Sequence, residues 1–350
     1  YGIVLISKIN IANFKVITPD IYQVILYYFT ICIFAYLYKI FNQKHCNITQ
    51  ERIKNTLYLL RYKSRPHLKK VKILMIILVI VFYSINKIPD NLKIYFIDVG
   101  QGDSTLIVTT NNKKILIDGG GSSSYNVGKN TLLPYLLDRR IKTLDYVIIS
   151  HFDEDHATGV AQILGKIDVS SIILTRQLEE NDIYRHILSI AKEKKIKLIY
   201  VKEGDVLKIG GIKISIIHPE NKLMINNPMN NNSIVCKVEY NSFSMLLTGD
   251  IEMEAEELIL RKNINLKADV LKVAHHGSKT STTGEFLKAI NPKVALIGVG
   301  KNNNFGHPSN EVIQRLKENG TRIYRTDENG EISITVNKKG RIIKIQRCIT

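Results

Sequence analysis

The feature that most constrains this chain is the segment His-Phe-Asp-Glu-Asp-His at residues 151–156, which follows an apolar run at 144–149. The apolar run predicts a buried strand, and its exit loop delivers two imidazoles and two carboxylates in the His, Asp, Asp, His order. These groups bind zinc, manganese or iron, and burying all four together requires a balancing cation. We therefore predict a divalent-metal site. A solvated acidic turn that caps a helix beginning near residue 157 is the alternative, but it leaves the later histidines unexplained.

A second cluster of metal-binding residue types follows two later strands. Asp250 closes the predicted strand 243–248, and a His-His-Gly-Ser segment that contains His275 and His276 closes the predicted strand 269–274. One carboxylate can bridge two cations about 3.5–4 Å apart, so Asp250 with imidazoles from a neighbouring strand predicts a two-metal centre.

Five of the nine histidines stand at strand-to-loop junctions, and they are His151, His156, His275, His276 and His307. The other four have no such setting and are expected to be surface or packing residues; they are His45, His67, His186 and His218.

From residue 92 onward, short apolar runs alternate with Gly, Asn and Asp turns and with helical patterns. We expect strands at 93–98, 104–109, 113–118, 144–150, 170–174, 198–202, 212–218, 233–239, 243–248, 269–274, 293–298, 321–325, 331–337 and 341–347. Helices are expected near 129–140, 156–165, 182–194, 251–262, 282–290 and 309–318. Two strand-rich halves, each followed by helices, predict an α/β fold in which two sheets are sandwiched between helical layers.

The first 90 residues have a different character and predict a membrane-associated region. The run at 21–38 carries no charge, which predicts a transmembrane helix near 21–41. A second helix is expected near 71–88, although its uncharged stretch of 14 residues, 73–86, is also compatible with a buried core helix. The chain begins with Tyr1 and lacks the pattern of a signal peptide, so it looks like the end of something longer.

The net charge of +17 is concentrated in this region, since residues 1–90 hold 13 Lys and Arg against 3 acidic residues. Eight of these cations and one acid, Glu51, lie at 42–70, between the two expected helices. The positive-inside rule keeps such a loop in the cytoplasm and, if the second run spans the membrane, places residues 91–350 at the outer face. If it does not, the large domain is cytosolic. The charge therefore indicates topology more than nucleic-acid binding, and four scattered cysteines imply no disulfide framework.

Seven ordered segments resemble the ComEC family of DNA-uptake channel proteins, whose catalytic domain is a metallo-β-lactamase-like αββα sandwich with HxDxDH in place of HxHxDH. The matching segments are 97–103, 115–120, 150–156, 230–235, 246–252, 271–279 and 306–308. The resemblance implies that residues 91–350 form a metal-dependent hydrolase domain. It also implies one or two preceding transmembrane helices, a location in the cell membrane and an extracellular catalytic domain.

The resemblance also implies a set of metal ligands. His151, Asp153 and Asp250 would hold one divalent ion, and the second would be held by Asp155, His156, Asp250 and His275. Hydrolytic relatives place a further histidine where this chain has 230–233, so Asn231, Ser233 or water must take that position. The oxygen-rich first site favours Mn²⁺ over Zn²⁺, and the identity of the two ions stays open.

The expected chemistry is phosphodiester hydrolysis by a water molecule that the two cations acidify. Asp155 is counted among the catalytic residues, together with His276 or His307, which would protonate or orient the leaving oxygen. Lys272 and Lys279 are candidates to contact a phosphate or to be ordinary strand-end residues. The glycines beside Asp103 and Asp118 predict tight turns instead of phosphate-binding loops. The two carboxylates are expected to brace the metal ligands.

The leading hypothesis is a nuclease that cleaves DNA outside the membrane during uptake. Its expected partners are single-stranded DNA, the membrane and other DNA-uptake proteins. Two alternatives remain. One is an enzyme acting on a small-molecule or cell-wall phosphodiester, since a fold does not fix a substrate. The other is a catalytically silent DNA-binding or gating module, which would bind DNA in a salt-sensitive way without hydrolysing it.

Overall fold

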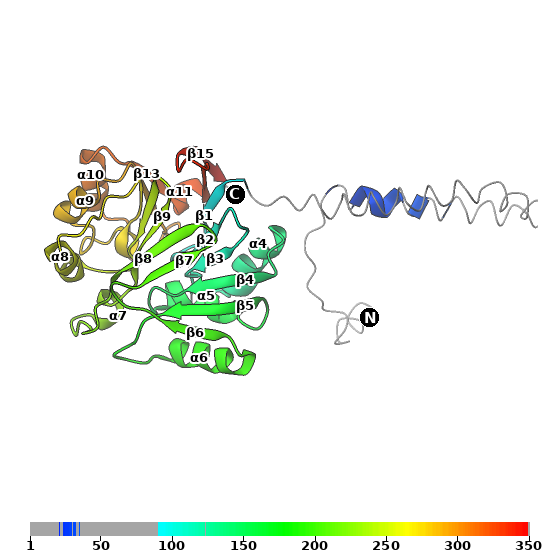
Figure 1. Ribbon diagram of the computed structural model, residues 1–350, viewed down its shortest axis with the longest axis horizontal. Helices are drawn as coiled ribbons and strands as arrows, with labels where there is room; N and C mark the ends of the chain where they lie inside the picture. Colours follow the sequence, from blue (N-terminus) through cyan, green and yellow to red (C-terminus); the bar gives the residue numbers. More distant parts are fainter. Residues whose placement is uncertain are drawn as a thin grey trace, which may run out of the picture. The chain divides into compact units, whose positions relative to one another are not determined.

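The computed structural model describes residues 90–122 and 124–348, together with residues 21, 24–29, 31, 32 and 35. The described positions between 21 and 35 are helical, and the predicted second span at 71–88 lies outside the described residues. Within the described residues, no helix combines the length and apolar character needed to cross a bilayer. The two units of the chain divide between residues 87 and 88, and the second unit carries both sheets (Figure 1).

The second unit contains two mixed β-sheets. The first has the strand order β15-β14-β1-β2-β3-β4-β5-β6, and the second has the order β13-β12-β11-β10-β9-β8-β7. The strands of the first sheet are β1 (Leu92–Phe96), β2 (Thr105–Val108), β3 (Lys114–Ile117), β4 (Thr143–Ile148), β5 (Asp168–Leu174), β6 (Lys197–Tyr200), β14 (Glu331–Val336) and β15 (Ile342–Cys348). Those of the second are β7 (Val206–Ile209), β8 (Ile212–His218), β9 (Val235–Tyr240), β10 (Phe243–Leu247), β11 (Val270–Lys272), β12 (Val294–Ile297) and β13 (Arg322–Arg325).

Helices accompany each sheet. The first sheet is covered by η1 (Gly128–Leu132), α4 (Leu133–Asp138), α5 (Glu154–Ile163) and α6 (Asp182–Lys194). The second is covered by α8 (Met253–Arg261), α9 (Gly284–Ile290) and α10 (Asn310–Glu318). Short turns of helix complete the described set, namely α7 (Pro228–Asn231), η2 (Ala274–Gly277) and α11 (Thr326–Asn329).

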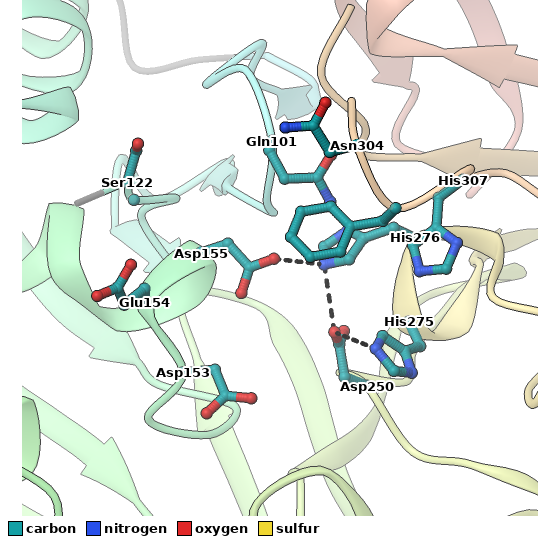
Figure 2. A pocket seen from close by; sticks show the side chains of 12 residues that line it. Gln101, Ser122, Asp153, Glu154, Asp155, Asp250, His275, His276, Asn304 and His307 are labelled. Carbon is teal, nitrogen blue, oxygen red and sulfur yellow. Dashed lines mark ion pairs between the residues drawn. The ribbon is translucent and has the colours of Figure 1, made fainter. Parts of the chain in front are cut away.

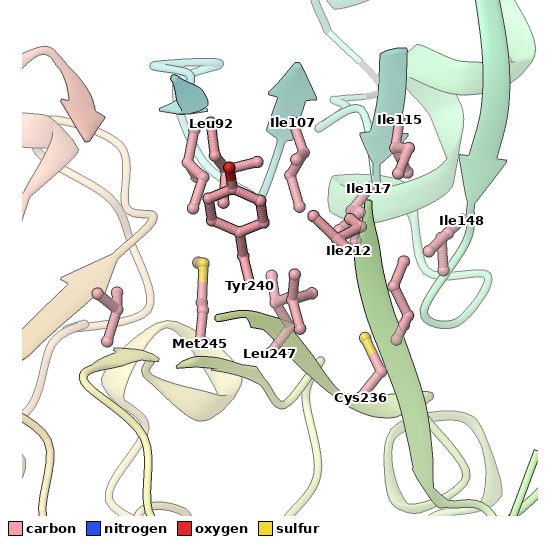
Figure 3. Packing of buried hydrophobic residues seen from close by; sticks show 14 of the residues in the cluster. Leu92, Ile107, Ile115, Ile117, Ile148, Ile212, Cys236, Tyr240, Met245 and Leu247 are labelled. Atoms are coloured by element: carbon pink, nitrogen blue, oxygen red, sulfur yellow. The ribbon is translucent and has the colours of Figure 1, made fainter. Parts of the chain in front are cut away.

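Three buried apolar clusters separate the layers. The central one lies between the sheets, where Ile107 and Ile148 of the first sheet meet Cys236 and Leu247 of the second (Figure 3). The other two lie between each sheet and its own helices. Because strand side chains alternate between the two faces, a sheet buried on both faces needs apolar residues at nearly every position. The predicted sandwich of two sheets between helical layers is confirmed.

One strand escaped the sequence prediction. Strand β7 has only four residues, and it pairs in antiparallel register with β8 across the turn at Gly210 and Gly211. Both glycines have positive φ, the conformation that tight hairpin turns require. The Gly-Gly pair between two apolar runs was therefore the available signal, and the shortness of the first run concealed it.

The direction of the strands determines where the chain can place polar side chains. Strands β3 to β6 are parallel to one another, as are β10 to β13. Their carboxyl ends share one edge of each sheet, which is where ligand sites form in α/β folds. The loops that follow β3, β4, β10, β11 and β12 leave from these edges, and each carries a residue of the site described below.

Candidate metal centre

Four buried side chains from distant parts of the sequence meet at the carboxyl ends of the strands. Asp103, His156, Asp250 and His276 each offer a ligand atom, and these atoms lie within 4.8 Å of one another. They come from the loop after β1, the first turn of α5, the end of β10 and η2. Among the residues that the structure describes, this is the group of acidic and imidazole side chains able to hold a metal ion.

The spacing around Asp250 is compatible with the ligand sphere of a metal ion. His156 Nε2 and His276 Nε2 each lie 3.2 Å from an Asp250 oxygen and 3.2 Å from each other. Asp155 Oδ2 lies 3.1 Å from His276 Nε2 (Figure 2). Ligands bound at about 2.0–2.2 Å to one tetrahedral ion are themselves about 3.3–3.6 Å apart, so the contacts of His156 and His276 with Asp250 have a spacing close to that of ligands to one divalent ion.

Each imidazole in the centre is held by its other ring nitrogen. His156 Nδ1 lies 3.0 Å from Asp118 Oδ2, and His276 Nδ1 donates to the Gly298 carbonyl oxygen at 2.7 Å. The Ser150 hydroxyl donates to Asp118, so it accepts from His151 Nδ1 at 3.0 Å. In all three rings Nε2 is left free to bind a metal, the arrangement that fixes tautomer and orientation in metal sites.

His151 supplies an independent test of the metal assignment. Its side chain is fully buried, and its Nε2 has no hydrogen-bond partner. The nearest charged oxygen is Asp153 Oδ2, 3.7 Å away. A buried ring nitrogen without a partner is costly unless a ligand fills the gap. The unpartnered Nε2 of His151 is therefore available to a ligand on the more open side of the centre, where Asp153 is 44% exposed.

The electrostatics of the centre show what a metal would replace. Against the effect of burial, the Asp250 carboxylate raises the pKa of His156 well above its usual value and that of His276 to about 10. Those same histidines, with Lys272, outweigh burial and hold the pKa of Asp250 far below its normal range. Without a cation the carboxylates are thus balanced by protons, and binding a metal releases those protons.

The remaining ligand candidates titrate differently. Burial, reinforced by the neighbouring His156, lowers the pKa of His151 to about 3, so this ring is neutral at physiological pH. Burial and the nearby Asp155 raise the pKa of Asp153 to about 6. Although burial opposes it, the hydrogen bond with His276 lowers the pKa of Asp155. His151 is therefore ready to bind a cation without losing a proton.

The backbone at η2 is unusual and decides which histidine reaches the centre. His275 and His276 both adopt left-handed backbone angles, with φ of 48° and 53°, and Gly277 follows at 80°. Consecutive non-glycine residues in this region are strained, which is typical of functional sites. The turn directs the two side chains differently: His276 Nε2 lies 3.2 Å from Asp250, whereas His275 Nε2 lies 4.0 Å away.

The distances to Asp250 differ from those expected for the predicted roles of the two histidines. The sequence assigned His275 to a metal and His276 to the leaving oxygen. In the structure His276 is buried between Asp155 and Asp250, while His275 lines the pocket beside Glu252, 3.5 Å away. Adjacent residues of the same type differ only in backbone conformation, and sequence carries almost no information about that.

The predicted lysine contacts are also corrected. Lys272 is buried and forms ion pairs with Asp103 and Asp250, while its ammonium donates to the Gly249 carbonyl. It is thus a fixed cation within the protein and is not placed to contact a phosphate. Lys279 is exposed and does not line the pocket.

Asn231 and Ser233 are both engaged within the protein. Ser233 Oγ accepts from the Asp250 backbone at 3.2 Å, and the Asn231 side chain accepts from the Glu252 backbone and donates to Asn226. Both polar side chains therefore hydrogen-bond within the protein next to Asp250. Their role is to position the loop that carries Asp250.

Asp118 was predicted to support a metal ligand, and it contacts His156. Its carboxylate accepts hydrogen bonds from Ser150 and forms an ion pair with the His156 imidazole.

The centre opens into a cavity of about 540 Å³. Asp153, Glu154 and Asp155 line one side, and Gln101 and Asn304 line another (Figure 2). Phe305 also lines the cavity. His307, predicted at the rim, lies there with its ring 5.7 Å from that of His275, and burial lowers its pKa. No sequence pattern singled out Phe305 or Asn304 beyond their place next to His307. Of the remaining described histidines, His186 is exposed and His218 is buried, as expected for surface and packing residues.

Comparison with known proteins adds independent information. A family model described as the metallo-beta-lactamase superfamily matches residues 97–301. ComE operon protein 3 of Bacillus subtilis is 37% identical over 254 residues, which cover 69% of this chain and 32% of that protein. Recombination protein 2 of Haemophilus influenzae is 29% identical over 308 residues, covering 85% of this chain and 36% of the relative.

A third relative carries competence in its name. Competence protein ComA of Neisseria gonorrhoeae is 29% identical over 269 residues, covering 76% of this chain and 35% of its own length. The chain thus spans about a third of the length of the curated relatives it matches.

Proposed function

The chain belongs to the metallo-β-lactamase superfamily and to its ComEC-type branch of competence proteins, and from this premise we propose that it is a nuclease that cleaves DNA. Its class is that of a metal-dependent hydrolase with a metallo-β-lactamase fold. The observation that carries the proposal is a set of three imidazoles, each anchored through Nδ1, of which His156 and His276 present Nε2 to Asp250 at an open pocket.

Two divalent ions, Mn²⁺ or Zn²⁺, fit the side chains of the centre. His156, His276, Asp155 and Asp250 would hold one, and His151, Asp153 and Asp250 would hold the other. When bound, such ions acidify water and neutralise charge that develops on a phosphoryl group. The second set has two carboxylates and one imidazole, which favours a hard cation such as Mn²⁺ at that position.

The chain's own residues supply positioning and hydrogen bonds. Asp118 and the Gly298 carbonyl hold the rings of His156 and His276, and Lys272 balances the charge of Asp103 and Asp250 from beneath. His275 and His307 line the pocket above the ligands. A neutral imidazole can donate one hydrogen bond and accept another, so His307 suits contact with a leaving oxygen.

DNA as the substrate is supported by the competence relatives. By the positive-inside argument we place the domain at the outer face of the cell membrane, with other DNA-uptake proteins as partners. Reaction of a cysteine introduced at the exposed Lys267 with a membrane-impermeant reagent in intact cells tests that placement; protection of the cysteine would contradict it.

The nuclease proposal is tested with the full chain purified in mild detergent. Single-stranded DNA should be cleaved when Mn²⁺ is present and not when it is chelated. The Asp155→Ala variant should lose activity, because it removes a carboxylate 3.1 Å from His276. Asp168→Ala, which changes an exposed aspartate at the start of β5, is the matched control and should remain active. Absence of metal-dependent DNA cleavage would refute the proposal, and hydrolysis of a chromogenic phosphodiester alone would move the substrate to small molecules.

A further inference from the structure

One large aromatic side chain at the pocket is exposed instead of packed. Phe305 lines the cavity and is 67% exposed. Its ring lies nearly parallel to that of His307, with an interplanar angle of 19° and centroids 6.0 Å apart. Single exposed apolar residues are common on protein surfaces, so the exposure of Phe305 alone indicates no function. The residues around Phe305 indicate one.

The loop that carries Phe305 is held rigidly. The Asn303 side chain accepts from the backbone N–H groups of Phe305 and His307 and donates to the carbonyl groups of Gly300 and His307. The start of the loop is fixed by Gly300, which donates to the Gln101 side chain at 3.1 Å. A rigid backbone that presents an exposed ring loses little conformational entropy on binding, which is the basis of preorganised recognition.

A series of rings connects Phe305 to the metal ligands. The His307 ring follows Phe305, the His275 ring lies 5.7 Å from that of His307, and the His276 ring lies 6.2 Å from that of His275. Phe305 is therefore located at the outer end of a path that leads down to Asp250. A ligand whose phosphate lies at the centre would place the adjoining part of the molecule near this ring.

The neighbours of Phe305 indicate the kind of group that would lie there. The amide side chains of Gln101 and Asn304 line the same side of the cavity. A flat ring with polar edges can stack on the phenyl face and hydrogen-bond to amides, and unpaired nucleobases have this chemistry. The carboxylates on the opposite side would repel a phosphate backbone that lacked a metal counter-charge.

We infer that Phe305 is a stacking platform for an unpaired nucleobase next to the scissile phosphate. This inference rests on the proposed nuclease function and deepens it by assigning single-stranded nucleic acid as the substrate class. Stacking on an aromatic side chain tolerates every base, so it supplies affinity without sequence preference.

The absence of tryptophan from the whole chain provides a direct test. In the Phe305→Trp variant the only tryptophan stands at the pocket, and its fluorescence should be quenched when a single-stranded oligonucleotide is titrated into the full chain with Ca²⁺. An abasic oligomer of equal length should not quench it. The control is Ile343→Trp, at a 55% exposed position on β15, which should respond to neither ligand. Equal quenching of the Phe305→Trp variant by both oligomers, or by neither, would overturn the inference.

Kinetics separate the role of this ring from the role of the centre. Phe305→Ala should raise KM for the oligonucleotide by about 5- to 100-fold, leave kcat nearly unchanged and leave the abasic oligomer unaffected. Phe305→Trp should restore KM. Equal effects on both substrates would overturn the inference while leaving the nuclease proposal intact. If neither substrate is hydrolysed by any form of the protein, the nuclease proposal fails, and the fluorescence titration still decides whether a base stacks at this position.

Discussion

The loop at residues 150–156 and the loop at residues 274–277 both bring imidazoles to the centre, and they differ in what holds those imidazoles. In the first loop, side chains hold the imidazoles: Ser150 contacts His151, and Asp118 contacts His156. In the second, the backbone does so, through left-handed residues and the Gly298 carbonyl. The first loop can therefore be recognised as a sequence motif, whereas the contribution of the second loop depends on its backbone conformation.

The largest expected effect concerns the choice between the two adjacent histidines. His276→Ala should lose bound metal and lower kcat/KM by about 1,000-fold or more, because it removes a ligand and leaves carboxylates unbalanced. His275→Ala should retain metal and lose about tenfold in kcat/KM. The two variants are compared by measuring their metal content by mass spectrometry and their rates of DNA hydrolysis.

The exposed His186 on α6 provides the control, and His186→Ala should behave like the unaltered protein. The reverse pattern, with metal lost from His275→Ala and retained by His276→Ala, would restore the assignment made from the sequence and break the comparison between the loops.

The next effect concerns the side-chain anchor of the first loop. Asp118→Asn removes the charge that orients His156 and should weaken metal binding by about 10- to 100-fold, as loss of such anchors generally does. Competition with a chelator of known affinity measures the change. Asp168→Asn, at an exposed aspartate, is the matched control. Unchanged affinity in Asp118→Asn would show that the imidazole needs no anchor and that both loops rely on the backbone.

The smallest expected effect concerns the backbone of the second loop. Gly277→Ala should lower the free energy of unfolding by about 2 kcal/mol, since a Cβ at φ 80° is strained and would lie 2.6 Å from Pro308 Cβ. Gly284→Ala, where a Cβ meets nothing within 4 Å, should change stability little. Chemical denaturation of both variants measures the difference. Equal stability would mean that the loop relaxes freely and that its conformation is not what directs His276.

Particular elements show how far the sequence reached. Helix α6 occupies 182–194, as its periodicity predicted, and the strands that lead to the centre lie within a few residues of their expected positions. Long apolar patterns predict elements well because they reflect burial on one or both faces. The four-residue β7 and the short α7 and α11 were missed, because too few residues carry the pattern.

The sequence by itself determined the sandwich of two sheets, the 151–156 motif and the involvement of Asp250, because strand periodicity and the order of ligand types are local properties of a chain. Only the tertiary structure decided that His276 instead of His275 meets Asp250, that Lys272 is a buried counter-charge and that Phe305 stands at the pocket. These outcomes depend on backbone angles at two residues and on contacts between segments more than 100 residues apart, such as His156 and His276. Such contacts arise from the face-to-face packing of two sheets, which brings the carboxyl ends of their strands together and which no local pattern records.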